Sequence, residues 1–213
     1  MPIQIDKSQW KRRAYCDFFG GLDVPFYSVT FRLDVTALHR FCKAEGISFY
    51  AGMIWATMRA INGLEEYRYE IRGEDIYLNE QLDPSYTFPL PDELFGINTI
   101  PWIEGETLSD FAARMKRTES TLSSPLPSAE ADEAGHNVYI SCLPWFDYEH
   151  VAQEFPLNRD DSTPRVLWGQ FTMDEGGRLT LPYTVQVNHR LIDGVHIAKL
   201  KTALTAELAA FGA

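Results

Sequence analysis

The last 35 residues constrain the fold most, because two hydrophobic periodicities follow each other there. Residues 179–187 alternate in polarity and are rich in β-branched side chains, which predicts a β-strand. From Val195 onward apolar residues recur at helical spacing. His189 and Asp193 lie between the two patterns. The sequence therefore predicts a strand that delivers a histidine to the edge of a sheet, with a helix behind it.

His189 is a candidate general base, although its spacing alone leaves two interpretations open. A rigid strand end followed by a loop can expose an imidazole, which is neutral often enough at pH 7 to accept a proton. A histidine beside a turn is more often a surface or hydrogen-bonded core residue, and His-x-x-x-Asp-Gly is short enough to arise by chance. The other histidines have no partner at motif spacing and are interpreted as structural or surface residues: His39, His136, His150 and His196.

Composition argues against several kinds of partner. The net charge of −11 disfavours nucleic acid and anionic membranes, because phosphate binding needs a basic field. No apolar run is long enough to cross a bilayer and the N-terminus lacks a signal-peptide pattern, so we expect a cytoplasmic protein. There is no dinucleotide fingerprint, P-loop or cluster of metal ligands, so no metal is expected.

The remaining pattern predicts one domain over residues 1–213, with helices and strands interleaved without a strict βαβ rhythm. This favours a mixed α/β sandwich. Helices are predicted at 9–19, 35–45 and 49–62, from Leu108, and from Val195. Strands are predicted at 25–33, 67–71, 75–78, 85–90, 94–103, 138–143, 166–173 and 179–187. Residues 123–135 are rich in Ser, Pro, Ala and Glu and predict a surface loop.

Several separated segments form an ordered set along the chain. They are Trp10-x-Arg12-Arg13 with Phe18-Phe19, Phe49-Tyr50, Tyr86-Thr87 with Phe95, Ile140-Ser141-x-x-Pro144-Trp145, and Leu181-Pro182 through His196. In this order and spacing they resemble the chloramphenicol acetyltransferase family over nearly the whole chain. The resemblance implies the α/β fold of CoA-dependent acyltransferases, a two-layer sandwich with a mixed sheet.

The resemblance also implies roles for individual residues. His189 matches the base that takes the proton from the acceptor hydroxyl, and Ser141 matches the serine whose hydroxyl binds the oxyanion of the tetrahedral intermediate. Asp193 and Arg12 match an ion pair that holds the loop carrying the histidine. Six positions match the lining of the acceptor pocket: Phe19, Phe26, Thr87, Phe95, Val166 and Trp168.

The partners implied by the resemblance are two small molecules and further copies of the chain. Acetyl-CoA is the expected cosubstrate and acyl donor, and chloramphenicol or a similar hydroxyl compound is the expected acceptor. No metal is implied. The resemblance further implies a homotrimer with its active sites between subunits, in which each histidine faces the pocket of its neighbour. Antibiotic resistance is the role that goes with this family.

Four departures from the family pattern bear on the identity of the acceptor. Asn188 stands where the family usually has a second histidine, and residues 190–192 replace a small apolar run. Phe19 stands where the best-known members have a tyrosine that hydrogen-bonds the antibiotic. Trp168 falls where they have a threonine that holds a water, and its indole either reduces the pocket or points into the core.

Two alternative functions use the same fold. Residues 188–194 also resemble the Asp-His-Arg-x-x-Asp-Gly motif of dihydrolipoamide acyltransferases, which makes a stand-alone thiol acyltransferase the first alternative. Nothing before residue 184 resembles a lipoyl or linker domain, and the Trp10 and Pro144-Trp145 segments favour the O-acetyltransferase. The second alternative is an inactive binding protein, which a pocket blocked by Trp168 would favour.

Overall fold

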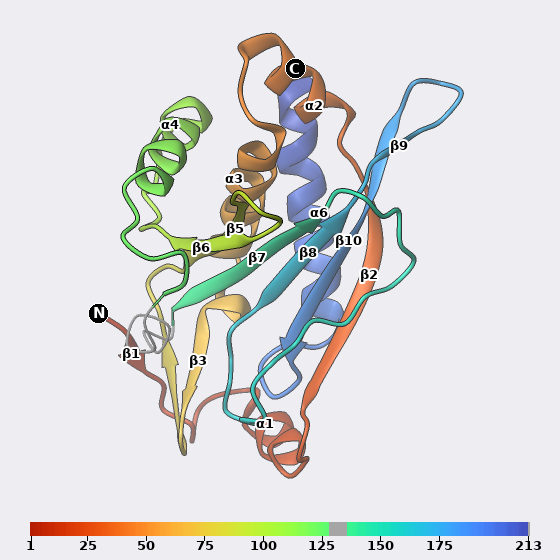
Figure 1. Ribbon diagram of the computed structural model, residues 1–213. Helices are drawn as coiled ribbons and strands as arrows, with labels where there is room; N and C mark the ends of the chain where they lie inside the picture. The colour runs from red at the N-terminus through yellow and green to blue at the C-terminus, as the bar shows by residue number, and fades with distance from the viewer. Residues whose placement is uncertain (128–135, 213) are drawn as a thin grey trace.

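The computed structural model describes residues 1–127 and 136–212, and strand β10 (Leu179–Asn188) lies next to the edge strand of its main sheet (Figure 1). The strand pairs with β2 along one edge and with β8 and β9 along the other. Most of the surface loop predicted over residues 123–135 falls outside the described ranges. His189 follows the last residue of β10 directly, as the alternation of residues 179–187 predicts.

The main sheet has seven strands in the order β2-β10-β8-β7-β5-β6, with β9 added beside β10. Strand β7 runs parallel to both β5 and β8, and the other pairs are antiparallel, so the sheet is mixed as predicted. Its strands other than β10 are β2 (Phe26–Asp34), β5 (Asp83–Pro89), β6 (Phe95–Thr99), β7 (Asn137–Leu143), β8 (Arg165–Gly169) and β9 (Thr172–Met173).

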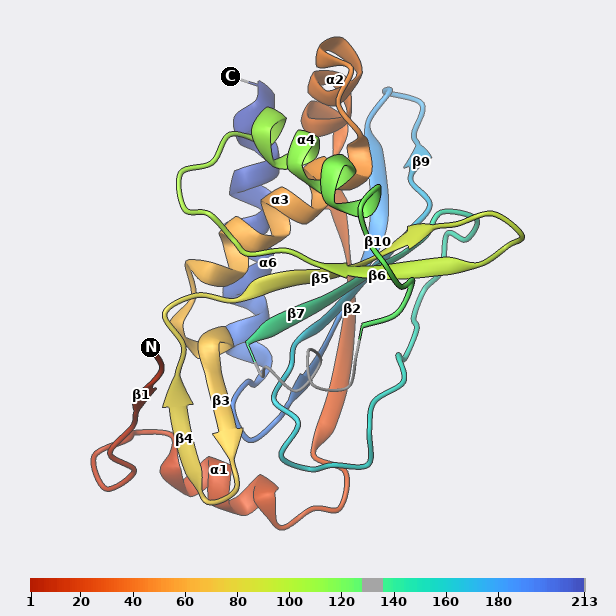
Figure 2. The ribbon, with the colours of Figure 1, turned by 60° about the vertical axis from the view of Figure 1, so that its left-hand side comes forward.

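The helices form a second layer against one face of this sheet (Figures 1 and 2). They are α2 (Thr36–Glu45), α3 (Phe49–Asn62), α4 (Leu108–Glu119) and α6 (Gly194–Ala209), while α1 (Arg13–Gly20) lies at the end of the sheet near His189. A separate three-stranded sheet contains β1 (Ile3–Gln4), β4 (Asp75–Leu78) and β3 (Tyr69–Arg72). Two 3₁₀ helices, η1 (Glu65–Arg68) and η2 (Ala210–Gly212), complete the described elements. The predicted two-layer α/β sandwich is confirmed.

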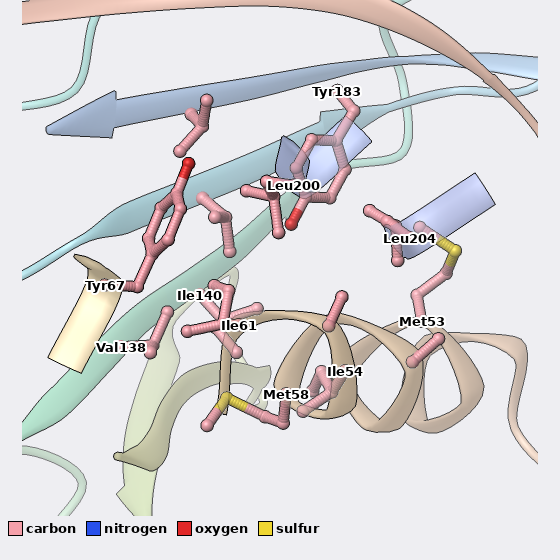
Figure 3. Packing of buried hydrophobic residues seen from close by; sticks show 14 of the residues in the cluster. Met53, Ile54, Met58, Ile61, Tyr67, Val138, Ile140, Tyr183, Leu200 and Leu204 are labelled. Carbon is pink, nitrogen blue, oxygen red and sulfur yellow. The ribbon is translucent and has the colours of Figure 1, made fainter. Parts of the chain in front are cut away.

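Helix α3 lies in the centre of the core, with the bounds that the sequence predicts. Its residues are apolar on nearly every face, and the Ser48 hydroxyl caps its N-terminus by accepting a hydrogen bond from the Ala51 amide. Figure 3 shows Met53 of α3 beside Leu204 of α6, and Ile61 of α3 beside Ile140 of β7. A helix without a polar face needs covering on all sides, and the sheet and the neighbouring helices provide it.

The second face of β10 is polar yet buried, because residues 144–164 cross it. Gln186 is 3% exposed and exchanges hydrogen bonds with the backbone of Gln153 at 3.0 and 3.2 Å. Thr184 bonds to the Thr30 hydroxyl at 2.7 Å and to the Tyr148 hydroxyl at 3.2 Å. Buried polar groups need such partners. The segment therefore completes this face of the sheet without adding a second hydrophobic core.

Several predicted boundaries are wrong: the strand predicted over residues 94–103 ends at Thr99, and the one predicted over residues 67–71 begins at Tyr69, after a 3₁₀ turn. Two further errors have an identifiable cause. The first helix begins at Arg13 rather than residue 9, because the Asp6 carboxylate holds Ser8 in a turn through its amide and its hydroxyl. The strand predicted over residues 166–173 divides into β8 and β9, because the Gln170 amide leaves the ladder to bond the Phe146 carbonyl at 2.7 Å. Both errors come from side-chain or long-range bonds that hydrophobic periodicity does not report.

Candidate active site

His189 is held rigidly at the end of β10. Its amide donates to the Pro25 carbonyl at 2.7 Å, so the backbone continues the pairing with β2 for one more residue. The Phe19 ring stacks on the imidazole with the centroids 3.8 Å apart and the planes inclined by 15°. The Tyr27 ring lies 4.4 Å away. These aromatic contacts leave the ring little freedom to rotate.

A backbone carbonyl selects the tautomer of His189. Nδ1 lies 3.1 Å from the Ile192 carbonyl oxygen, and a carbonyl only accepts, so the hydrogen of the neutral ring is assigned to Nδ1. Nε2 then carries the lone pair, and it has no hydrogen-bond partner among residues 1–127 and 136–212. The ring is therefore arranged to accept a proton through Nε2.

Arg12 holds the loop that follows the histidine. Its guanidinium donates to the His189 carbonyl at 3.0 Å, to the Arg190 carbonyl at 3.1 Å and to the Asp193 carboxylate at 2.7 Å. The side chain of Arg12 is 12% exposed and that of Asp193 is 32% exposed. The predicted pairing of Arg12 with Asp193 is present, and the two backbone contacts extend it to the residues that carry the imidazole.

Asp193 joins this loop to helix α6. Its carboxylate accepts from the Val195 amide at 3.3 Å and caps the helix. Burial raises the pKa of Asp193, but the hydrogen bond from Arg12 and the charges of His196 and Arg12 outweigh burial and hold that pKa below its usual value. Asp193 is therefore an ionised structural group, and it is not hydrogen-bonded to His189.

His196 supports the loop, and near neutral pH it does so as the uncharged imidazole. Its Nδ1 accepts a hydrogen bond from the Asp193 amide at 3.0 Å, which requires an unprotonated nitrogen. The same nitrogen lies 3.0 Å from the Asp193 carboxylate, a distance that would be an ion pair only if the ring were charged. Burial lowers the pKa of His196 and is the largest influence on it, which agrees with the neutral form. The predicted structural role of His196 fits these contacts.

Ser141 lies on β7 beside a second hydroxyl group. Its Oγ is 3.1 Å from Oγ1 of Thr87 on β5, and either oxygen can be the donor. The Thr87 carbonyl accepts from the Tyr50 hydroxyl at 2.7 Å, which ties β5 to α3 at this point. When the Thr87 hydroxyl donates to Ser141, the Ser141 proton remains available to donate to a developing oxyanion.

A groove of about 1720 Å³ opens beside these two hydroxyls. Aromatic side chains form much of its wall, among them Tyr50, Phe95, Trp145 and Phe155. Glu119 also borders it, and burial raises the pKa of this carboxyl. Pockets for small ligands usually measure about 300–1,000 Å³. The groove is larger than one small acceptor requires, which leaves room for acetyl-CoA or for part of another chain.

His189 and Ser141 of one chain are far apart. Ser141 lies opposite Leu167 of β8, and Leu167 lies opposite Thr184 of β10. His189 follows Thr184 by five residues, which is about 16 Å of extended strand. No single acceptor hydroxyl can contact both side chains of the same chain.

The six predicted pocket residues fall into three groups. Thr87, Phe95 and Trp168 border the groove. Phe19 lies against His189, and Phe26 contacts the groove residue Phe155 with the ring centroids 4.6 Å apart. Val166 is fully buried on the face of β8 that contacts the helices and is not among the residues that border the groove. A single chain therefore brings together only part of the predicted set.

Trp168 points into the core. In the register of β7 and β8 it lies opposite Cys142, so its side chain is on the other face of the sheet from Ser141. It is 1% exposed, and its ring lies 5.4 Å from that of Tyr50 and parallel to that of Tyr183. Of the two orientations considered for this indole, the structure has the core orientation, which leaves the groove beside Ser141 open.

Two tyrosines of the site are not among the site residues that the sequence predicts. Tyr27 packs against His189, and burial raises its pKa to about 12. Tyr50 fixes the strand beside Ser141 and borders the groove. Both act across long sequence separations, and the sequence predicts a site role for neither, although Tyr50 belongs to the Phe49-Tyr50 segment of the family resemblance. No group of three potential metal ligands occurs within the described residues, and no described helix is long and apolar enough to cross a membrane.

Known proteins resemble this chain along nearly its whole length. The family model described as "Chloramphenicol acetyltransferase" matches residues 3–205. Chloramphenicol acetyltransferase 3 of Escherichia coli is 26% identical over 199 residues, covering 92% of each chain. A solved chloramphenicol acetyltransferase superposes with a TM-score of 0.88 at 22% identity, covering 98% of this chain and 100% of the other. A probable dihydrolipoamide acetyltransferase from Listeria monocytogenes superposes with a TM-score of 0.71 at 15% identity, covering 95% and 93%. The two superpositions establish the fold.

Proposed function

Because the chain belongs to the chloramphenicol acetyltransferase family and is an acetyl-CoA-dependent acyltransferase, we propose that it acetylates a hydroxyl group of chloramphenicol or a similar small molecule. His189 is the general base of the proposed reaction, and Ser141 stabilises the oxyanion. Arg12 and Asp193 hold the loop that carries the base. The observation that carries this assignment is the orientation of His189, whose Nδ1 is bound to a carbonyl so that Nε2 can accept a proton.

The proposed reaction is a direct transfer. Nε2 of His189 removes the proton from the acceptor hydroxyl while the oxygen attacks the thioester carbonyl of acetyl-CoA. The carbonyl oxygen becomes an oxyanion, and the Ser141 hydroxyl donates a hydrogen bond to it. The intermediate then breaks its C–S bond, and the CoA sulfur leaves with the proton that the imidazole returns. The ester product and free CoA balance the reaction without an acyl-enzyme.

We propose that each active site combines two chains of a homotrimer, one contributing His189 and the other Ser141 with its groove. Within a chain the two residues are offset by about 16 Å along the strands and by two strand spacings across the sheet, which supports this arrangement because one substrate hydroxyl cannot contact both. The size of the groove supports it as well, since a neighbouring chain can fill part of the space. A closed ring of identical contacts gives each subunit one complete site.

Subunit mixing tests this arrangement. His189→Ala and Ser141→Ala chains are each expected to have little activity, measured as acceptor-dependent release of free CoA thiol. Trimers assembled from an equal mixture are expected to recover about a quarter of the wild-type activity, because one boundary in four pairs an intact base with an intact serine. A mixture of His189→Ala with His189→Gln chains is the control and should recover nothing. Failure of the first mixture to regain activity would contradict a shared site.

A thiol acceptor is the alternative that one observation favours. Residues 188–194 resemble the motif of dihydrolipoamide acyltransferases, and the chain shares its fold with a probable member of that class. Measuring transfer to chloramphenicol and to dihydrolipoamide with the same enzyme preparation separates the two. We expect the alcohol to be acetylated faster, and a higher kcat/KM for the dithiol would assign the chain to the alternative. An inactive binding protein lacks support, because Trp168 leaves the groove open.

A further inference from the structure

Asn188 connects the end of β10 to residues 159–161. Its side-chain amide donates to the Arg159 carbonyl and to the Asp161 carbonyl, both at 2.9 Å. The amide oxygen accepts from the Arg190 backbone N–H at 3.0 Å. Asn188 is 2% exposed, so these bonds form away from solvent. The residue directly before the proposed base is therefore fixed by three hydrogen bonds.

Arg190, directly after the proposed base, is held by the same segment. Its guanidinium donates to the Asp160 carboxylate at 2.6 Å, with the Arg190 side chain 9% exposed and the Asp160 side chain 34% exposed. A Cβ placed at Gly20 would lie 3.1 Å from Nε of Arg190, so the end of α1 packs closely on the guanidinium. The residues on either side of His189 thus both contact residues 159–161.

We propose that Asn188 and the Arg190–Asp160 pair are positioning residues for His189. This inference rests on the proposed role of His189 as the base. Arg12 holds the loop through the His189 and Arg190 carbonyls, and its hydrogen bonds go to these carbonyls and to Asp193 rather than to the Asn188 or Arg190 side chains. Residues 159–161 provide a second, independent support. A base must lie within about 3 Å of the proton that it removes, and a displacement of about 1 Å can reduce the rate about 100-fold.

The chemistry at residue 188 is specific to an amide. Two carbonyl oxygens face one side chain, and both need a donor. An amide nitrogen carries two N–H groups and satisfies both. A carboxylate has none, and an imidazole, which the family usually has here, cannot direct one nitrogen at two acceptors. Asn188 and residues 159–161 therefore form a matched pair, and the departures at positions 188 and 190 have a common explanation.

The segment that supports the base also borders the groove. Residues 151–156 contribute to the groove wall, and residues 159–161 follow after two residues. One stretch of chain thus shapes the groove of its own subunit and supports a base that, in the proposed trimer, serves a neighbour. Residues 159–161 themselves contact Asn188 and Arg190 and are not among the residues that border the groove, so damage there should affect the rate of transfer rather than the binding of either substrate.

The test compares two ion pairs that residues 144–164 make with the rest of the chain, Asp160 with Arg190 and Asp147 with Arg32. Asp160→Asn removes the carboxylate charge that binds Arg190. Asn188→Asp removes the two N–H donors of the side-chain amide and leaves a side chain of nearly the same shape. Asp147→Asn is the matched control, because Asp147 pairs with Arg32 at 2.8 Å and is similarly exposed at 35%. We expect kcat to fall about 10- to 100-fold for Asp160→Asn and Asn188→Asp, with KM for acetyl-CoA and acceptor within about two-fold of wild type.

Asp160→Glu keeps the charge and is expected to retain most of kcat, which a simple packing defect at this position would not allow. The inference is overturned if kcat of Asp160→Asn, the less disruptive variant, stays within about two-fold of the Asp147→Asn value, or if the loss appears in KM alone. Full activity of His189→Ala would instead remove the proposed function itself, whatever the other variants do. The two failures are therefore distinguishable.

Discussion

The two ends of the main sheet treat their reactive side chains differently. Contacts from its own chain fix His189: two aromatic rings, a carbonyl at Nδ1 and the guanidinium of Arg12. Ser141 has a single hydroxyl neighbour and borders a groove of about 1720 Å³. The surroundings of His189 are thus complete within one chain, whereas Ser141 borders open space. The difference indicates that His189 is preorganised by its own chain, whereas the groove beside Ser141 has room for the substrates and for part of a neighbouring chain.

The largest effect is expected from removing the base. His189→Gln keeps a hydrogen-bonding side chain but cannot act as the base, so we expect kcat/KM to fall at least about 10³-fold. The measurement is the acceptor-dependent release of CoA thiol, with acetyl-CoA binding followed by calorimetry as a control. Binding should persist, because the groove lies away from His189 in the same chain. Activity within ten-fold of wild type would show that the rigid end of the sheet has no chemical role.

The second largest effect on the rate is expected at Ser141. Ser141→Ala removes a donor to the oxyanion, and we expect kcat to fall about 100-fold while KM changes little. Thr87→Val removes the neighbouring hydroxyl and is expected to reduce kcat less, because it only orients Ser141. If Thr87→Val has the larger effect, the threonine rather than the serine contacts the intermediate.

Arg12 should contribute more to the stability of the fold than the adjacent Arg13 does. Arg12→Ala leaves two carbonyls and the Asp193 carboxylate without their donor, so the free energy of unfolding should fall by about 1–3 kcal/mol. Arg13→Ala is the control, because the Arg13 side chain is 58% exposed and its pair with Asp17 should contribute at most about 0.5 kcal/mol. Urea unfolding of both variants checks this. Equal stabilities would contradict the importance of the Arg12 contacts.

The smallest effect is a dependence of stability on pH at the histidine end. The pKa of His196 is below its ordinary 6.5 in the folded chain, so the unfolded chain binds the proton more readily and stability falls as pH drops below about 6.5. Asp193 adds to the loss at lower pH, because its folded pKa is also depressed. His196→Gln keeps an acceptor for the Asp193 amide without the titration, and its stability should change less between pH 7 and 5. An unchanged slope would exclude His196 as the cause.

Local pattern predicted much of this fold. The bounds of α3 follow from an apolar stretch between Ser48 and Gly63, and the end of β10 follows from the alternation up to Val187. The position of Trp168 could not be predicted, because the face that it occupies depends on the register of β8 with β7 and β10. Register is a long-range property that no single strand encodes.

The site was predicted only in part, because some of its contacts also join residues that are far apart in the sequence. His189, Asp193 and the strand end lie close together in the sequence, so their spacing is visible, whereas Arg12 and Ser141 could be placed only through resemblance to a family. The contacts of Asn188 with residues 159–161 join segments about 30 residues apart through backbone carbonyls, which leave no pattern in side-chain identity. Sequence therefore identified the residues of the proposed chemistry more readily than the residues that hold them.

The distance along β10 between Thr184 and His189 has a consequence for the genetics of the proposed trimer. A newly made chain would carry both reactive groups and yet be inactive until it assembles with other chains. Specific activity should therefore decline when the protein is diluted enough for the trimer to dissociate. Two alleles with lesions at opposite ends of the sheet would rescue each other in one cell. A single defective copy would silence one of the three boundaries of its trimer, whichever of the two residues carries the lesion.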